Sequence, residues 1–416
     1  MLRENNGQDC LKFYSSFQNP LMQLSHIDQA FSQPTIYDLI LSCLPPPTIM
    51  RCGRTCRAIY VATKDFNTRA YTINRHLSRF FDNPEGFRSL QAQTAALISG
   101  SNALQFLDRT HYADSDLDVF VFSDTVRVIG RWLINHEGYS FTPRPDQLPE
   151  FEDAALQLSS SPVELDGFNM HDAYRLTGIA GVHSVSKAPD LTIQVITTQR
   201  SPMDCILSFH STCVMNVIAF DAAYSLYPRA TFDFRCGLSL AQISPREAKA
   251  LAKYATRGWA IHSTIWPHEE DTLQRLFKVY DLRRMGDRDS WVIPLDTTNI
   301  TLRSPFTLSS PPFTEDPAIF SSWKLTESTS ESGQYRMAYH FLSSTILKYD
   351  YVNADRDFLL VMIPFFQKQG VLEHSKFRGL PKSNSDQEAW TWWDASLPGF
   401  YKAYLKQLED TRMEEG

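Results

Sequence analysis

The chain has 416 residues and a formal net charge of −7, with 43% hydrophobic and 12% aromatic residues. This apolar content suffices for two or three packed domains and excludes an intrinsically disordered chain. The acidic balance excludes a global field that attracts nucleic acid, and no local basic patch stands out. If the protein is an enzyme, a small-molecule or protein acceptor is therefore favoured over a polynucleotide.

The ends of the chain bear on its compartment. Residues 1–32 are polar, without the apolar core of a secretion signal, and are expected to be loosely ordered. The longest apolar run, Phe358–Phe366, contains Pro364 and is too short to cross a bilayer. The 7 cysteines are odd in number and scattered, which is typical of free thiols in a reducing compartment. We predict a protein of the cytoplasm or nucleus, with no membrane partner.

Residues 33–90 are predicted to be helical. A first short helix spans about Thr35 to Cys43, and a second begins after the prolines at 45–47, because proline suits a helix start but not its interior. The apolar positions expected to form the packed side are Ile36, Leu39, Ile40, Leu44, Ile49, Met50, Ala58 and Ile59.

The stretch Pro34–Tyr60 resembles the F-box. It has a proline-initiated helix, a Leu-Pro-Pro connection and an Arg-x-x-x-Thr-Cys-Arg helix. The resemblance implies docking on a Skp-type adaptor that brings substrates to a cullin ubiquitin ligase. An ordinary helical cap on a neighbouring domain explains the same residues, so both interpretations stay open.

Residues 91–240 hold the most informative motif. An apolar run enters a turn at Gly100-Ser101, a short helical pattern follows, and after a polar loop comes the strand Leu117–Phe122. Side chains alternate along a strand, so Asp116 and Asp118 point to one face. Two adjacent carboxylates repel each other unless a cation or a proton lies between them, and Mg²⁺ prefers such oxygen ligands. Glycine and serine at a helix start allow a phosphate to approach the backbone N–H groups.

This order of residues resembles the signature of the DNA polymerase beta-like nucleotidyltransferases. The resemblance implies an α+β fold with a mixed sheet flanked by helices. It also implies that Gly100 and Ser101 bind the nucleoside triphosphate, and that Asp116 and Asp118 ligate Mg²⁺ or Mn²⁺. The spacing from the glycine to the first aspartate is slightly longer than is usual in the family. The simpler alternative is an ordinary turn, helix and strand.

The family needs a third carboxylate from a later strand. The best candidate is Asp190, at the entrance of the alternating segment Leu191–Ile196, where it would complete the metal site as a catalytic residue. If the register instead puts Gln194 or Thr192 there, the site lacks its third acid, and a mechanism in which two metals hold the attacking and leaving oxygens is in doubt.

Two functions follow as expectations. One is metal-dependent transfer of a nucleotidyl group from an NTP to an unidentified acceptor, and the other is a catalytically inactive binding module on an F-box-type adaptor. The pattern from Lys253 to Trp259 also resembles functionally uncharacterised fungal proteins that join this fold to an F-box-like N-terminus. Lys249, Lys253 and Arg257 share one helical stripe, which could face phosphate or could be a solvated surface.

The rest of the chain is predicted by composition. Residues 241–300 are expected to be a helical extension, and residues 301–335, rich in Ser, Thr and Pro, to be a linker or loop. Residues 336–416 are rich in aromatic side chains, for which a small satellite core is favoured over a recognition surface.

Overall fold

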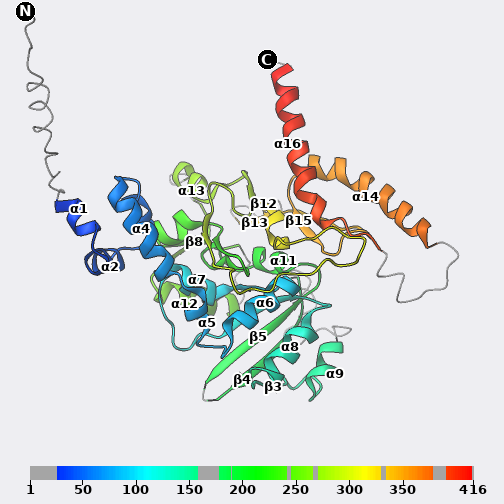
Figure 1. Ribbon diagram of the computed structural model, residues 1–416, viewed down its shortest axis with the longest axis horizontal. Coiled ribbons are helices and arrows are strands. Elements are labelled where there is room, and N and C mark those ends of the chain that lie inside the picture. The colour runs from blue at the N-terminus through cyan, green and yellow to red at the C-terminus, as the bar shows by residue number, and fades with distance from the viewer. Residues whose placement is uncertain are drawn as a thin grey trace, which may run out of the picture. The chain divides into compact units, whose positions relative to one another are not determined.

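The computed structural model describes residues 26–157, 178–188, 190–240, 245–265, 270–328, 334–377 and 390–414 (Figure 1). The chain divides into two compact units, Met1–Ala70 and Tyr71–Gly416. The predicted helical segment 33–90 is therefore divided, and its residues 71–90 belong to the larger unit.

The first unit is helical. Its helices are α1 (His26–Phe31), α2 (Pro34–Ser42), α3 (Pro46–Cys52) and α4 (Arg57–Ala70). Proline begins α2 and α3, as expected, because a proline at the first helical position loses no hydrogen bond. The helices enclose a small core whose buried side chains are Tyr37, Leu41, Ile49, Ala62 and Phe66.

Four of the eight apolar residues predicted to pack in this unit are exposed, so this part of the prediction was wrong. Ile36, Leu39, Ile40 and Met50 are exposed, Leu39 by 72%. The buried stripe of α2 instead runs through Tyr37 and Leu41, which are one turn apart on the face that packs against α4. We refer to these four exposed side chains of the consecutive helices α2 and α3 as the α2–α3 apolar surface.

The second unit is built on a mixed sheet of 8 strands, so the predicted α+β class with a mixed sheet is confirmed. The neighbours β2 and β5 run parallel, and the other neighbouring pairs of this sheet are antiparallel. In spatial order the strands are β11 (Trp291–Pro294), β7 (Ala222–Ser225), β6 (Asn216–Ile218), β1 (Leu97–Ser99), β2 (Leu117–Phe122), β5 (Leu191–Thr198), β4 (Ile179–Lys187) and β3 (Ser140–Thr142).

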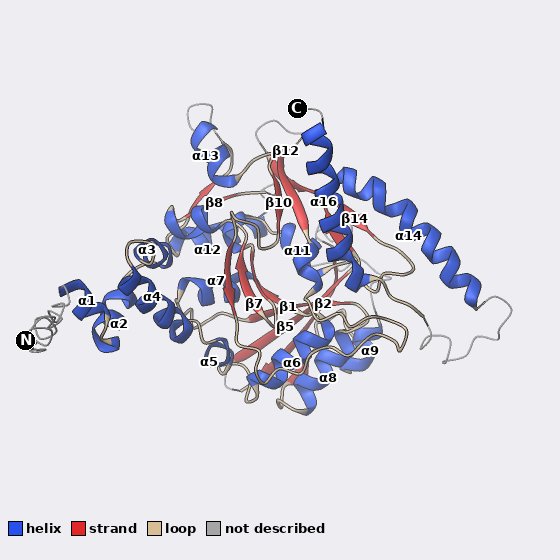
Figure 2. Cartoon of the chain, turned by 45° about the horizontal axis from the view of Figure 1, so that its top comes forward, coloured by secondary structure: helices blue, strands red, loops and turns tan. Residues whose placement is uncertain are grey.

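Helices cover both faces of this sheet (Figure 2). On one face lie α8 (Val126–Asn135) and α9 (Phe151–Leu156), and buried His183 of β4 contacts the Ala154 carbonyl at 3.2 Å. On the other, α11 (Pro202–Leu207) packs on β2 and β5. The remaining helices of the sheet region are α5 (Ile73–Leu77), α6 (Pro84–Thr94), α7 (Gly100–Asp108), α12 (Pro245–Thr256) and α13 (Glu270–Phe277).

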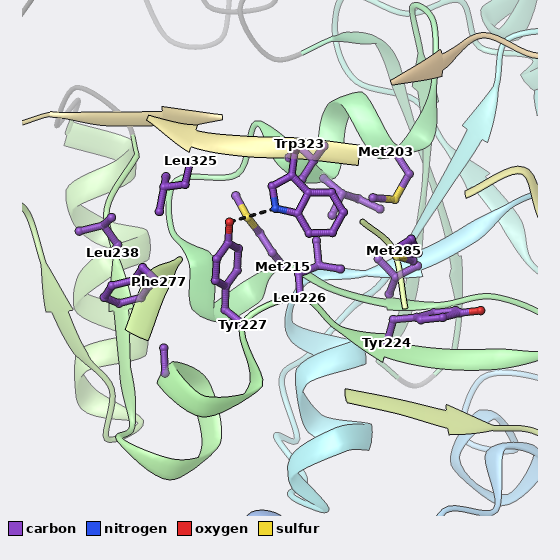
Figure 3. Packing of buried hydrophobic residues seen from close by; sticks show 14 of the residues in the cluster. Met203, Met215, Tyr224, Leu226, Tyr227, Leu238, Phe277, Met285, Trp323 and Leu325 are labelled. Atoms are coloured by element: carbon purple, nitrogen blue, oxygen red, sulfur yellow. Dashed lines mark hydrogen bonds between the residues drawn. The ribbon is translucent and has the colours of Figure 1, made fainter. Parts of the chain in front are cut away.

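The main core joins the sheet to later parts of the chain (Figure 3). Trp323 is fully buried and donates its indole N–H to the Tyr227 hydroxyl at 3.0 Å. It belongs to β12 (Ser322–Glu327), which pairs with β10 (Leu282–Arg284) and β13 (Tyr335–Ala338). The predicted linker 301–335 thus contains a strand, whose alternating Trp323 and Leu325 enter the core.

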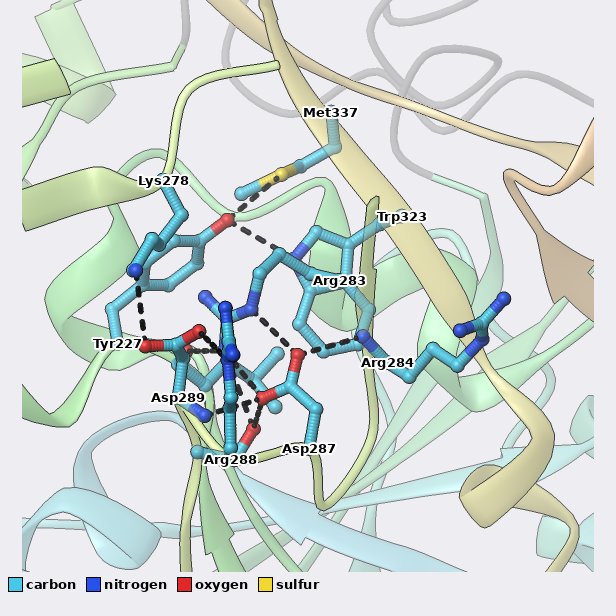
Figure 4. A network of polar contacts seen from close by, with 11 residues as sticks. Tyr227, Lys278, Arg283, Arg284, Asp287, Arg288, Asp289, Trp323 and Met337 are labelled. Carbon is cyan, nitrogen blue, oxygen red and sulfur yellow. Dashed lines mark hydrogen bonds and ion pairs between the residues drawn. The ribbon is translucent and has the colours of Figure 1, made fainter. Parts of the chain in front are cut away.

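A buried guanidinium ties β10 to this core (Figure 4). Arg283 pairs with Asp287 at 2.7 Å and donates to the Leu226 carbonyl at 3.0 Å. Next to it, Lys278 and Asp289 form an ion pair at 3.2 Å. Both charges of the Arg283 pair are compensated, which a buried arginine requires.

The aromatic side chains of the C-terminal part pack in a second core, which they share with Ala95, Phe122 and Phe313 from earlier in the chain. The C-terminal part contains the hairpin of β14 (His340–Leu342) and β15 (Tyr351–Asn353), and the helices α14 (Arg356–Lys376) and α16 (Leu397–Glu414). The remaining short strands, β8 (Cys236–Leu238) and β9 (Ala260–His262), pair in parallel, so the predicted helical extension 241–300 also contributes strands. Among the described helices, none is both long and apolar enough to cross a membrane.

Candidate functional site

The turn between β1 and α7 brings the backbone against a carboxylate. Gly100 begins α7 with φ of +68°, in the left-handed region that favours glycine. A Cβ at this position would lie 3.0 Å from Asp118 Oδ2. The glycine therefore serves both the turn and the close approach of the helix start to Asp118.

Ser101 is placed beside this turn, but its side chain is already engaged. It is buried, and its hydroxyl lies 2.8 Å from the Ser115 hydroxyl, which also accepts a hydrogen bond from Gln105 Nε2 at 2.8 Å. These contacts fasten the loop between α7 and β2 to the helix. In this arrangement the Ser101 hydroxyl holds the loop in place.

Asp118 lies in a row of polar side chains that crosses the sheet. Strand registers align it with Ser99 on β1 and Gln194 on β5, and align Gln194 with Ser184 on β4. Asp116, two residues before Asp118, shares this face, as the alternation predicts. The pair Asp116 and Asp118 is thus brought together with Gly100.

The environment of Asp118 disfavours its charge. Burial, together with the charge of Asp116, raises the pKa of Asp118 to about 7, while the positive charge of Lys253 opposes this shift. Both carboxylates are half-buried. The pair accordingly has the property expected of two crowded acids, since one of them holds its proton near neutral pH.

The position beside the pair is occupied by an amide. Gln194 Nε2 donates to Asp116 Oδ2 at 3.2 Å. Asp190 is exposed, precedes β5, and lies four residues before Gln194, which corresponds to about 13 Å along an extended strand. The register therefore gives the neighbouring position to Gln194, one of the two alternatives that the sequence left open, and places Asp190 near the strand entrance.

Helix α12 brings side chains toward this face. Arg257 stacks on Tyr112, its Cζ 3.7 Å from the ring centre, and Tyr112 lies in the loop that leads to Asp116. Lys253, one helical turn earlier, is exposed and close enough for its charge to act on Asp118. Lys249, at the start of the stripe, is exposed. The predicted solvated surface therefore fits Lys249, whereas Lys253 and Arg257 act on the site.

The donor set fits a hard cation only in part. Two carboxylates and one amide could hold a single Mg²⁺ that keeps several waters. Among the residues that can be described, no group of three His, Cys, Asp or Glu side chains is arranged to hold a metal ion. The described part of the chain therefore offers no ligands for a second metal shared by three acids, and the ammonium of Lys253 already compensates part of the negative charge.

Comparison with known protein families, with curated proteins and with solved structures found no match to this chain.

Proposed function

We propose that this protein is a binding module on a ubiquitin-ligase adaptor, in which a nucleotidyltransferase-like unit has lost two-metal chemistry. The observation that carries the proposal is the hydrogen bond from Gln194 to Asp116, at the position where a third acid would be needed. The F-box-like helices of the first unit would provide the contact with a Skp-type adaptor.

The amide of Gln194 matters because it is uncharged and because it donates a hydrogen bond. Two divalent ions that hold the attacking and leaving oxygens need several anionic ligands between them. Gln194 brings no charge, and its Nε2 donates to a carboxylate oxygen that a metal would use. The positive charge of Lys253 also acts on Asp118, so less negative charge is left for divalent ions, which supports binding over catalysis.

The α2–α3 apolar surface supports the adaptor contact. Ile36, Leu39, Ile40 and Met50 are exposed on two adjacent helices of a unit whose core is formed by other residues. Exposed apolar patches of this kind are typical of protein interaction sites. The surface lies within Pro34–Tyr60, the stretch that resembles the F-box.

A second function keeps some support. The same face combines the Gly100 turn with the Asp116 and Asp118 pair, and a Cβ added at Gly100 would lie 3.0 Å from Asp118 Oδ2. Nucleotidyl transfer from an NTP to a small molecule or protein, with one Mg²⁺ or Mn²⁺, would use these residues to hold the triphosphate. Asp190 would then have to approach from the strand entrance.

A transfer assay separates the two functions. The full chain is incubated with Mg²⁺ or Mn²⁺, each α-labelled NTP and cell extract, beside an Asp116→Asn/Asp118→Asn variant. The binding module predicts no incorporation by either protein. Label transferred by the wild type and not by the variant would replace our proposal with the enzymatic one.

Adaptor binding is tested on the first unit. We expect the full chain to bind a purified Skp-type adaptor and Leu39→Asp to weaken binding at least tenfold, because a buried carboxylate without a partner is costly. Ile27→Asp is the matched control, since Ile27 is 55% exposed but lies on α1, outside the F-box-like stretch. Equal binding by both variants, or no binding by the wild type, would remove the adaptor from the proposal.

A further inference from the structure

Helix α14 is apolar on two opposite sides. Its inner side packs into the C-terminal core through Phe358, Leu359, Met362 and Phe366. Its outer side exposes five large apolar side chains: Leu360 by 61%, Val361 by 57%, Ile363 by 37%, Val371 by 70% and Leu372 by 50%. A helix that is hydrophobic all round is normally buried, so the outer side requires a partner.

The described elements of the same unit do not supply that partner. In both ribbon views α16 lies beside the first part of α14, and the rest of α14 runs along the margin of the unit (Figures 1 and 2). The ring contacts continue beyond the start of α14. Phe358 meets Tyr401 of α16 at 5.1 Å, Phe365 meets Phe400 at 5.0 Å, and His374 near the end of α14 meets Trp390 at 4.9 Å. These contacts still leave the five outer side chains exposed.

Four of the five outer side chains are arranged symmetrically along the helix. Leu360-Val361 and Val371-Leu372 are mirror images about position 366. In an antiparallel contact centred there, Leu360 lies opposite Leu372 of the other helix, and Val361 opposite Val371. A twofold interface requires this correspondence, because each residue must meet its mirror position on an identical surface.

The charges allow the same pairing. From Phe358 to Leu372 the helix has one charged side chain, Lys368, which is exposed. In the antiparallel register Lys368 faces Pro364 of the other copy and not its own equivalent. Its long apolar stem can lie along the partner while the ammonium reaches water. No buried charge therefore opposes contact between two such helices.

We infer that the outer side of α14 is a self-association surface, on which a second copy of this chain docks antiparallel through its own α14. The five exposed apolar side chains offer on the order of 400 Å² per copy, about half of the 800 Å² per partner that a stable interface of standard size buries. The dimer is accordingly weak and depends on protein concentration.

Sedimentation of the full chain over a wide concentration range measures this directly. The wild type is expected to shift from monomer to dimer between about 10 μM and about 1 mM, the range of weak complexes. Leu372→Glu should weaken dimerisation at least tenfold. Leu308→Glu, at a side chain that is 94% exposed and outside α14, should leave it unchanged. A wild type that stays monomeric throughout, or a Leu372→Glu variant that dimerises normally, overturns the inference.

Cross-linking tests the antiparallel register. Four native cysteines are first replaced by serine, so that they form no disulfides of their own: Cys10, Cys43, Cys52 and Cys56. A mixture of Val361→Cys chains and Val371→Cys chains should form mixed disulfides, whereas either variant alone should form few. Cross-linking of each variant with itself and not in the mixture would indicate parallel pairing and contradict the proposed register.

Discussion

At the residue scale, two features of the structure disfavour any side chain at position 100. The positive φ of Gly100 and the nearby Asp118 oxygen are separate constraints. Gly100→Ala should therefore lower the free energy of unfolding by about 2 to 3 kcal/mol, through backbone strain and a crowded Cβ. Gly138→Ala is the matched control, because its φ is +73° with nothing within 4 Å, and strain alone should cost about 1 kcal/mol.

Chemical denaturation of both variants measures this difference. If the two glycine substitutions have the same effect, Asp118 does not restrict the space in front of Gly100. The approach of the α7 start to the carboxylate would then be looser than the geometry indicates.

Asp118 makes stability depend on pH. Because burial and Asp116 raise its pKa to about 7, the folded chain keeps a proton that the unfolded chain releases above pH of about 4. Wild-type stability should thus fall as pH rises from about 4 to 7. Asp118→Asn removes this proton uptake, so the variant should be more stable than the wild type above pH 7, by roughly 1 to 3 kcal/mol.

Thermal unfolding at a series of pH values tests this prediction. Asp124→Asn, at an exposed aspartate on the loop after β2, is the control and should follow the wild-type profile near neutral pH. Parallel profiles for Asp118→Asn and the wild type would show that Asp118 titrates as an ordinary exposed acid.

Some residues of the candidate site are predictable from the sequence and others are not. Gly100, Asp116 and Asp118 could be grouped because a turn and a strand of fixed period position them locally. The neighbour of the pair could not be identified, since β5 is distant in sequence and a slip of two residues exchanges one polar side chain for another. The stacking of Arg257 on Tyr112 depends on the docking of α12, which no local pattern encodes.

At the element scale, the ion pair between Arg283 and Asp287 holds β10 against the core. Arg283 is only 2% exposed, so Asp287→Ala would leave a buried guanidinium without its carboxylate. This should lower the free energy of unfolding by about 3 to 5 kcal/mol. Arg288→Ala removes an arginine whose side chain is 90% exposed and should change stability by less than about 0.5 kcal/mol.

Denaturation curves for the two variants provide the comparison. A small effect of Asp287→Ala would mean that the Leu226 carbonyl and Ser290 compensate Arg283 without the carboxylate. In that case the network in Figure 4 would contribute little to the attachment of β10.

Elements were predictable where a strong local signal fixes them. The proline starts of α2 and α3 and the strand that carries Asp118 follow from such signals. β12 was hidden in a stretch rich in Ser, Thr and Pro, where Trp323 and Leu325 are the only marks of a buried face. Apolar residues occur all round helix α14, so its sequence pattern does not indicate which side packs against the core.

At the scale of the whole molecule, we propose a different function for each of the two units. The first unit offers an apolar surface to a protein partner, and the second presents the face with Asp116, Asp118 and Gln194. The self-association of α14 belongs to the second unit and would bring two copies of both surfaces into one assembly.

The ligands of the acid pair decide between the two functions, and a crystal structure with Mn²⁺ and a non-hydrolysable NTP analogue identifies them most directly. Anomalous scattering locates the ions without ambiguity. We predict at most one Mn²⁺, held by Asp116 and Asp118, with Gln194 beside them and Asp190 not coordinated. Two Mn²⁺ ions bridged by Asp116 and Asp118, with Asp190 as the third carboxylate, would contradict the binding-module proposal and establish the site as that of a metal-dependent transferase.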